Sequence, residues 1–283
     1  MKLFLLDTPK FKIDGGAFFG IVPKTMWEKK YPADENNMCN AACRSMLIKE
    51  SGRLILIDNG IGEKNDSGSQ DGYFVDFSED LEGNIKKIGF DPKDITDVVL
   101  THLHFDHCGG TTKIDVLTKN EISVFPNANY YISQIQWDNA INPNYREKSS
   151  YFKNKFEFLA DTNKLRLVKQ ELYLTPNIHL RFFNGHTSGL MLPMIKHEDK
   201  TLFFAGDLIP ALASIPLAWV SAYDLYPLTS ITEKQEILKE AEQNNWILIF
   251  QHDYYNECCN LIHTPRGVRA NKSLKFNELF NED

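Results

Sequence analysis

The sequence predicts an α/β fold in which two β-sheets are sandwiched between helices, that is, a four-layer αβ/βα sandwich. Short apolar runs of strand character alternate with segments of helical periodicity over the 283 residues. No internal repeat, low-complexity tract or Pro/Ser-rich linker divides the chain, so we expect one domain over residues 1–283. The predicted strands end repeatedly at a His or an Asp, namely at Asp58, His102, His186, Asp207 and His252.

The first half of the chain contains three runs rich in aliphatic or aromatic residues. The run at 54–57 ends at Asp58-Asn59-Gly60, which is a turn signal. Leu81, Ile85 and Ile88 follow helical spacing up to a glycine. We therefore expect strands at 54–57, 98–100 and 130–132, and helices at 79–89 and 134–140. Residues 141–160 show no clear periodicity and predict an excursion from the core.

The second half repeats this alternation of strands and helices. Ile178, Leu180 and Phe182 alternate with other residues, as in a half-buried strand. We expect strands at 178–182, 202–205 and 246–250, and an amphipathic helix at 232–244. Loops at strand ends are the places where a rigid sheet can hold several ligands around one point.

Composition places the chain with ordinary globular proteins, since 42% of its residues are hydrophobic and 24% are charged. The net charge of −7 gives no support to nucleic-acid binding. The first apolar run has only four residues and no apolar stretch reaches 18, so we expect no membrane segment and a cytoplasmic location. Five scattered cysteines fit reduced thiols better than a disulfide framework.

The segment at 101–110 concentrates ligand side chains directly after a predicted strand. His102, His104 and His107 supply three imidazoles, and Asp106 supplies a carboxylate. His102 and His104 are two residues apart, as on one side of an extended segment. Imidazole with carboxylate suits zinc, iron or manganese, and neutral imidazole binds metal well near pH 7. The cluster therefore predicts a metallohydrolase.

Four motifs together resemble the metallo-β-lactamase superfamily: the HLHFDH run at 102–107, Gly185-His186, Gly206-Asp207 and the strand-end His252. The resemblance spans about Leu54 to His252 and implies the αβ/βα fold of that family. It also implies two divalent metal ions, with zinc favoured over iron or manganese. By the resemblance, His102, His104 and His186 hold the first metal, Asp106, His107 and His252 hold the second, and Asp207 bridges both. Asp58, in the family's Asp-x-Gly turn, would steady the ligand set.

Such a dinuclear site implies hydrolysis without a Ser or Cys nucleophile. Two cations that share a water lower its pKa, and the bridging hydroxide attacks a carbonyl carbon or a phosphorus. Asp106 is expected to pass a proton to the leaving group in addition to binding metal. Asp106 and the bridging Asp207 are therefore the predicted catalytic residues.

Two further stretches resemble the branch of methyl parathion hydrolases and quorum-quenching lactonases: Gly15–Trp27 and the region from Gly206 to Pro227. This branch implies a small-molecule substrate, either a lactone or an aryl ester, with phosphotriester hydrolysis as a side activity. By analogy it also implies a homodimer. One departure is clear, because compact lactonases carry a Tyr three residues after the bridging Asp and this chain has Pro210. Tyr223 is a candidate replacement.

Aromatic residues are candidate pocket walls, and an apolar mouth would favour lactones or aryl esters over highly charged substrates. The candidates are Phe18, Phe19, Trp27, Trp137 and Tyr223. Two other activities on the same fold stay open at this point: iron-dependent redox chemistry of the persulfide dioxygenase type, and glyoxalase II-like thioester hydrolysis. The retained Asp106 and His107 favour two metals over one, and so favour the hydrolase.

Overall fold

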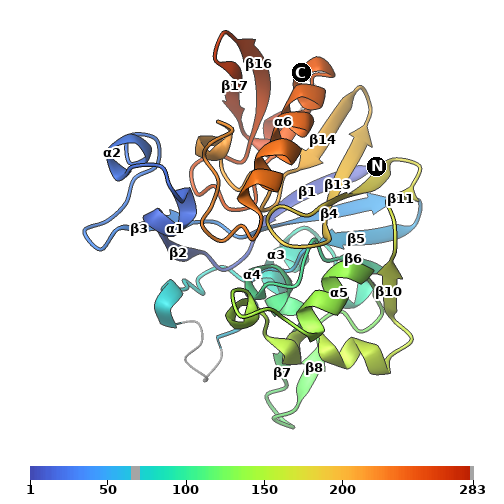
Figure 1. Ribbon diagram of the computed structural model, residues 1–283. Helices are drawn as coiled ribbons and strands as arrows, with labels where there is room; N and C mark the ends of the chain where they lie inside the picture. Colours follow the sequence, from blue (N-terminus) through green and yellow to red (C-terminus); the bar gives the residue numbers. More distant parts are fainter. Residues whose placement is uncertain (65–70, 281–283) are drawn as a thin grey trace. The chain divides into compact units, whose positions relative to one another are not determined.

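The computed structural model describes residues 1–64 and 71–280, and the chain divides into two compact units. Unit 1 comprises Met1–Phe11 and Ala42–Gln170, and unit 2 comprises Lys12–Ala41 and Glu171–Asp283. Each unit contains a large sheet (Figure 1). Each unit also has its own buried apolar core. The expectation of one domain over residues 1–283 stays a prediction.

The sheet of unit 1 has six strands in the order β1-β4-β5-β6-β9-β10. Their bounds are β1 Lys2–Asp7, β4 Arg44–Glu50, β5 Arg53–Ile57, β6 Asp97–Val99, β9 Asn129–Ser133 and β10 Leu165–Val168. β1, β4 and β5 pair antiparallel, whereas β5, β6, β9 and β10 pair parallel. Parallel strands end at the same edge, so the segments that follow β5 and β6 leave the sheet as neighbours.

Local sequence signals explain the regular elements of unit 1. The apolar run Leu54–Ile57 is buried, as predicted, because β5 lies in the interior of the sheet. The predicted helix at 79–89 is α3, Leu81–Lys87, and the Asp80 carboxylate caps it by accepting a hydrogen bond from Gly83 N at 2.6 Å. Gly89 follows with a φ of +87°, a conformation that ends a helix and favours glycine.

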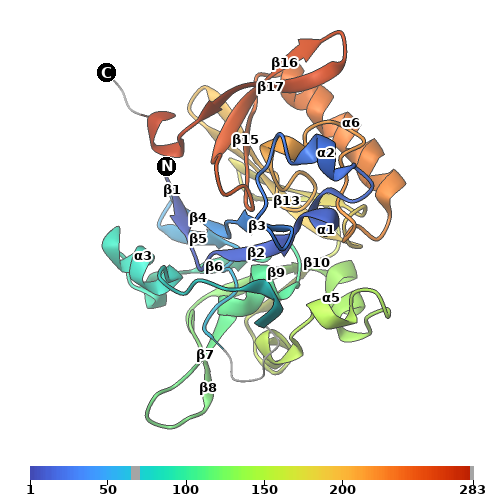
Figure 2. The ribbon, with the colours of Figure 1, turned by 90° about the vertical axis from the view of Figure 1, so that its left-hand side faces the viewer.

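The remaining segments of unit 1 are short. α4 is a single turn at Phe105–Cys108, and the predicted helix at 134–140 is α5, Gln134–Ile141. β7, Thr112–Ile114, and β8, Glu121–Ser123, form a small hairpin (Figure 2). Single-turn 3-10 helices occur at Asp71–Tyr73, Pro92–Asp94, Gly109–Thr111, Lys148–Ser150 and Lys153–Lys155, and a slightly longer one at Glu157–Asp161.

The prediction that residues 141–160 leave the core was wrong. The segment is irregular, but Tyr151, Phe156 and Leu159 are buried members of the apolar core of unit 1. Successive 3-10 turns place these side chains inward at uneven intervals, which is why no period of 2 or 3.6 residues is visible.

The sheet of unit 2 has seven strands in the order β11-β12-β13-β14-β15-β16-β17. Their bounds are β11 Leu172–Thr175, β12 Ile178–Phe183, β13 Leu190–His197, β14 Lys200–Phe204, β15 Ile247–Ile249, β16 Cys258–Thr264 and β17 Gly267–Leu274. All neighbours pair antiparallel except β14 and β15, which are parallel. Two further strands, β2, Phe11–Asp14, and β3, Met38–Ala41, pair in a small separate sheet. Between them in the sequence come the short helices α1, Gly15–Phe19, and α2, Lys24–Trp27.

The parallel pair β14 and β15 requires a crossover, and α6, Pro227–Gln243, provides it. α6 packs against β16 and β17 (Figure 1). The helix begins at Pro227 rather than at the predicted Thr232. Proline is favourable in the first turn, and the residues that follow it lack the apolar periodicity on which the prediction relied. Two further 3-10 turns lie at Leu212–Ser214 and Phe276–Glu278.

All five cysteines are buried free thiols, which confirms the expectation of reduced cysteines. Within the two described stretches, the chain forms no helix that combines the length and the apolar character needed to cross a membrane.

Candidate metal centre

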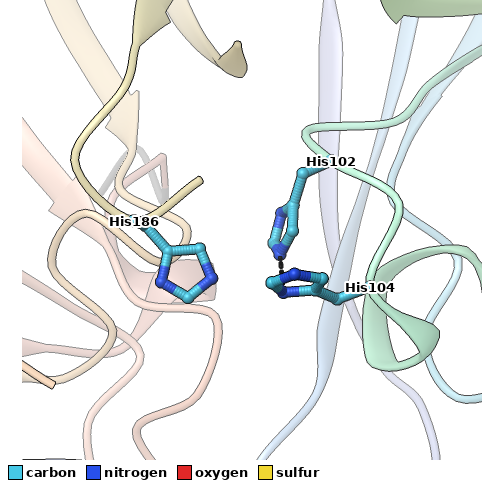
Figure 3. Close-up of side chains that lie close together, drawn as sticks. All are labelled: His102, His104 and His186. Carbon is cyan, nitrogen blue, oxygen red and sulfur yellow. Dashed lines mark hydrogen bonds between the residues drawn. The ribbon is translucent and has the colours of Figure 1, made fainter. Parts of the chain in front are cut away.

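Three imidazoles from one short segment of unit 1 lie close together. The segment follows β6, and α4 then carries His107. His102 Nε2 lies 3.0 Å from His104 Nδ1 (Figure 3), and the ring centroids of His102 and His107 are 3.8 Å apart. All three side chains are buried. Imidazole nitrogens gathered this closely away from water are the donor arrangement that transition-metal cations prefer.

Asp58 lies behind this group and is fully buried, as a residue that steadies ligands should be. Its Oδ1 accepts a hydrogen bond from Thr101 N at 2.7 Å, and its Oδ2 accepts one from Thr101 Oγ1 at 2.8 Å. The same Oδ2 lies 2.9 Å from His107 Nδ1. A carboxylate at Nδ1 favours the imidazole form with its proton there, so the Nε2 lone pair of His107 is presented on the opposite side.

Asp106 keeps 16% of its side chain exposed, and its Oδ2 lies 3.7 Å from His107 Nε2. The Cys43 thiol donates a hydrogen bond to the Asp106 carbonyl at 2.8 Å and so holds the first turn of α4. Burial raises the pKa of the neighbouring Cys108, which keeps this thiol protonated. Cys108 is fully buried and packs within the apolar core of unit 1.

His104 contacts a carboxylate that the sequence reasoning missed. Its Nε2 lies 3.4 Å from Glu147 Oε1, and Glu147 is 3% exposed. Tyr151 donates to Glu147 Oε1 at 3.1 Å, and Asn139 and Asn144 donate to Oε2 at 2.8 Å each. These residues come from α5 and from the irregular segment at 141–160, which contained no pattern that pointed to His104.

Unit 2 holds a second group, in which one carboxylate lies between two imidazoles. Asp207 Oδ2 is 3.1 Å from His186 Nε2, and Asp207 Oδ1 is 2.9 Å from His252 Nε2. The three residues follow β12, β14 and β15, as the strand-end pattern predicted. Each oxygen of Asp207 thus faces a different imidazole, which is an arrangement suited to a bridging carboxylate.

A second carboxylate, Asp224, lies 2.9 Å from His186 Nδ1, and both residues are buried. Asp224 lies in the stretch from Gly206 to Pro227 that resembles the lactonase branch, but no motif in the sequence assigned it a role. His252 is held through its backbone, since its N–H donates to the Pro210 carbonyl at 3.2 Å. Pro210 therefore has a backbone role in this loop, although it lacks the hydroxyl of a Tyr.

Four of the five predicted pocket aromatics have core positions. In unit 2, Phe18, Phe19 and Trp27 are at most 3% exposed, and Phe19 stacks on Trp27 at a centroid distance of 5.2 Å. In unit 1, Trp137 is buried and packs edge-on against Phe156. Only Tyr223 among the five is accessible, with 39% of its surface exposed. Their role as pocket walls stays a prediction.

The donor chemistry of the two groups fits divalent metal binding. Unit 1 offers three imidazoles and one carboxylate, and unit 2 offers two imidazoles and one carboxylate. The ligand atoms of His102 and His104, of His102 and His107, and of Asp106 and His107 lie within 4.8 Å of one another. Nitrogen and carboxylate oxygen donors of this kind suit zinc, iron or manganese better than calcium or magnesium.

Comparison with known proteins gives matches over most of the chain. The model of the metallo-beta-lactamase superfamily matches residues 41–252. An N-acyl homoserine lactonase of Bacillus thuringiensis is 24% identical over 230 residues, which are 75% of this chain and 81% of that protein. The N-acyl homoserine lactonase AttM of Rhizobium radiobacter is 30% identical over 187 residues, which are 63% of this chain and 66% of that protein.

Solved structures agree with the predicted fold. A probable metal-dependent hydrolase from Staphylococcus aureus is 30% identical with a TM-score of 0.85, and the match covers 97% of this chain and 98% of that one. AidC, a dizinc quorum-quenching lactonase, has a TM-score of 0.78 at 23% identity, with 97% of this chain and 95% of that one covered. The predicted α/β sandwich of the metallo-β-lactamase fold is confirmed, and the chain belongs to the metallo-β-lactamase superfamily.

Proposed function

We propose that this protein is a hydrolase that uses two divalent metal ions to open an ester-like bond, with a lactone as the preferred substrate and aryl esters next. The observation that carries the proposal is the pair of His/Asp groups, one in each unit, placed where strands of the two sheets end. A buried carboxylate backs His107 in one group and His186 in the other. Such carboxylates are typical partners of histidines that bind metal.

The ligand roles follow the family resemblance. In this proposal His102, His104 and His186 would hold one ion, Asp106, His107 and His252 would hold the other, and Asp207 would serve both. When bound, two cations supply a polarised carbonyl and a water acidic enough to act as a nucleophile near neutral pH. Zinc is the ion we favour, and residues 1–283 are proposed to act as one domain.

The side chains of the protein supply orientation and proton transfer. Asp58 keeps the Nδ1 proton of His107 in place, because its carboxylate is fully buried and bonded to Thr101 as well. During hydrolysis the water gives up a proton as its oxygen bonds to the carbonyl carbon, the acyl carbon–oxygen bond breaks, and the leaving oxygen gains one proton in return. We assign the delivery of that proton to Asp106, whose partial exposure lets it exchange protons with solvent.

The proposed substrate class rests on the relatives of this chain and on Pro210, which stands where compact lactonases carry a Tyr. Proteins similar to this chain include N-acyl homoserine lactonases from two bacterial genera, which favours a lactone over a phosphotriester. Pro210 offers no hydroxyl to the carbonyl oxygen, so we propose that the exposed Tyr223 of the same unit takes that role. The Tyr223→Phe variant should then lower kcat for lactones about tenfold, with a smaller change in KM.

Metal analysis tests the first part of the proposal. Elemental analysis of the purified protein should find close to two equivalents of metal, and His104→Ala or Asp207→Ala should lower both metal content and turnover. One equivalent of iron with no hydrolytic activity would instead support a redox enzyme of the persulfide dioxygenase type.

A substrate panel tests the second part. Acyl-homoserine lactones, aryl esters, phosphotriesters and thioesters should be compared by kcat/KM at equal metal loading. We expect the lactones to rank first. A thioester that outranks the lactones by tenfold or more would refute the lactonase proposal in favour of a glyoxalase II-like activity.

A further inference from the structure

His186 lies between two carboxylates of unit 2, one at each ring nitrogen. Its Nδ1 is 2.9 Å from Asp224 Oδ1, and its Nε2 is 3.1 Å from Asp207 Oδ2. His186 is 3% exposed and Asp224 is 4% exposed, so the contact between His186 and Asp224 is shielded from water. Asp207 faces a second imidazole as well, whereas Asp224 faces no other histidine among the contacts that the structure describes.

The loop that carries His186 is held by one face of α6. Ser230 Oγ donates to Asp224 Oδ2 at 2.5 Å, so both oxygens of Asp224 are engaged. Three residues further along the helix, Glu233 accepts hydrogen bonds from Asn184 N at 2.7 Å and from Gly185 N at 3.0 Å. Residues three and four apart share one helix face, so this face holds Asp224 and the turn before His186 at the same time.

Backbone contacts complete the arrangement. Leu225 N donates to the His186 carbonyl at 3.0 Å, and Tyr226 N donates to the Gly185 carbonyl at 2.9 Å. A Cβ atom at position 185 would lie only 2.3 Å from Ser230 Oγ, so the loop approaches α6 as closely as a glycine allows. The His186 ring therefore has little freedom to rotate away from Asp224.

We propose that Asp224 is the positioning residue that keeps the proton of His186 on Nδ1 and so presents Nε2 as the metal-binding nitrogen. A charged acceptor at Nδ1 favours the imidazole with its proton at that atom and increases the basicity of the other nitrogen. This inference rests on the proposed function, because it assumes that His186 binds metal. Asp224 touches neither substrate nor metal in this role.

The test is the metal affinity of Asp224→Asn. Asparagine keeps the shape of the side chain but removes the charge that favours a proton on Nδ1. Metal-stripped protein should be titrated with Co(II) in competition with a chelator, and the variant should bind one of the two equivalents about 10- to 100-fold more weakly. Its Co(II) absorption bands should also shift. Glu240→Gln is the matched control, since Glu240 lies on the same helix and pairs with Arg181 instead; it should stay within about twofold of the wild type.

A second variant keeps the inference testable if Asp224→Asn does not fold. Ser230→Ala removes a hydrogen bond from Asp224 and leaves the carboxylate, so we expect weaker Co(II) binding by about three- to tenfold. Affinities within twofold of the wild type for every folded variant of Asp224 and Ser230 would overturn the inference.

His186→Ala separates this inference from the proposed function. If His186→Ala binds both Co(II) equivalents as tightly as the wild type, the ligand role of His186 is wrong, and the role of Asp224 falls with it. If His186→Ala loses an equivalent while Asp224→Asn and Ser230→Ala bind normally, the proposed function stands and the inference about Asp224 is refuted.

Discussion

Replacing Lys234 with Met should destabilise the protein by about 2–6 kcal/mol, because Lys234 Nζ is the donor for several buried or partly buried backbone carbonyls. Lys234 lies on α6 and is 1% exposed. Its Nζ donates to Ser214 O at 2.6 Å, to Trp219 O at 2.9 Å and to Pro216 O at 3.1 Å. This side chain therefore ties the segment at 214–219 to the helix.

The magnitude follows from the carbonyls that lose their donor. Pro216 O also accepts a hydrogen bond from Trp219 N at 2.9 Å, so it stays satisfied in the variant. The buried Ser214 O and the partly buried Trp219 O depend on the lysine, and each group that loses its partner costs about 1–3 kcal/mol, with Trp219 O at the lower end. Met preserves most of the apolar stem of Lys234, so lost packing contributes little.

The stability lost in Lys234→Met should increase with pH. Burial lowers the pKa of Lys234 to about 7 from its ordinary value of 10.5, although the charge of Asp224 opposes this shift. Between these two values the unfolded chain binds more protons than the folded one, so the free energy of unfolding of the wild type rises with pH in this window. Lys234→Met lacks this term. The stability gap between the two proteins should therefore be larger at pH 9 than at pH 7.

Urea unfolding followed by circular dichroism at pH 7 and pH 9 measures both effects. Lys239→Met is the matched control, because Lys239 lies on the exposed side of the same helix. It should change the free energy of unfolding by less than about 0.5 kcal/mol. The reasoning is refuted if Lys234→Met is as stable as this control, or if the gap to the wild type narrows between pH 7 and pH 9.

Two further variants test the supports of the proposed ligands. Gly185→Ala should lower the free energy of unfolding by about 1–3 kcal/mol and lower the metal content, because its Cβ would lie 2.5 Å from the Cα of Ser230, which cannot rotate away. The control is Gly72→Ala, which has open space around it and should be nearly neutral in urea unfolding. Asp58→Ala removes the acceptor of three short contacts, so it should lower the free energy of unfolding by about 2–4 kcal/mol. It should also lower the metal content. Asp80→Ala, which removes only the cap of α3, should cost about 1 kcal/mol and keep its metal; equal metal loss in both Asp variants would contradict the role of Asp58.

Much of the fold was predictable because its signals are local. The buried run at 54–57, the helix that ends before Gly89 and the alternating strand at 178–182 all correspond to observed elements. The hairpin strands β16 and β17 were missed, because partly exposed strands carry weaker apolar patterns. The irregular but buried segment at 141–160 was misread for a related reason, since its inward side chains follow no regular period.

The sequence by itself determined the identity of the candidate ligands, because HLHFDH, Gly185-His186 and Gly206-Asp207 are short motifs read within a few residues. It also determined the position of Asp58, which follows a strand in a recognisable turn. The tertiary structure alone decided which side chains stand behind the histidines. Asp224 reaches His186 across 38 residues, and Glu147 approaches His104 from an irregular segment. A hydrogen bond between distant segments imposes no period and no spacing on the chain, so an orienting carboxylate looks in sequence like any solvated acid until the fold brings it to its partner.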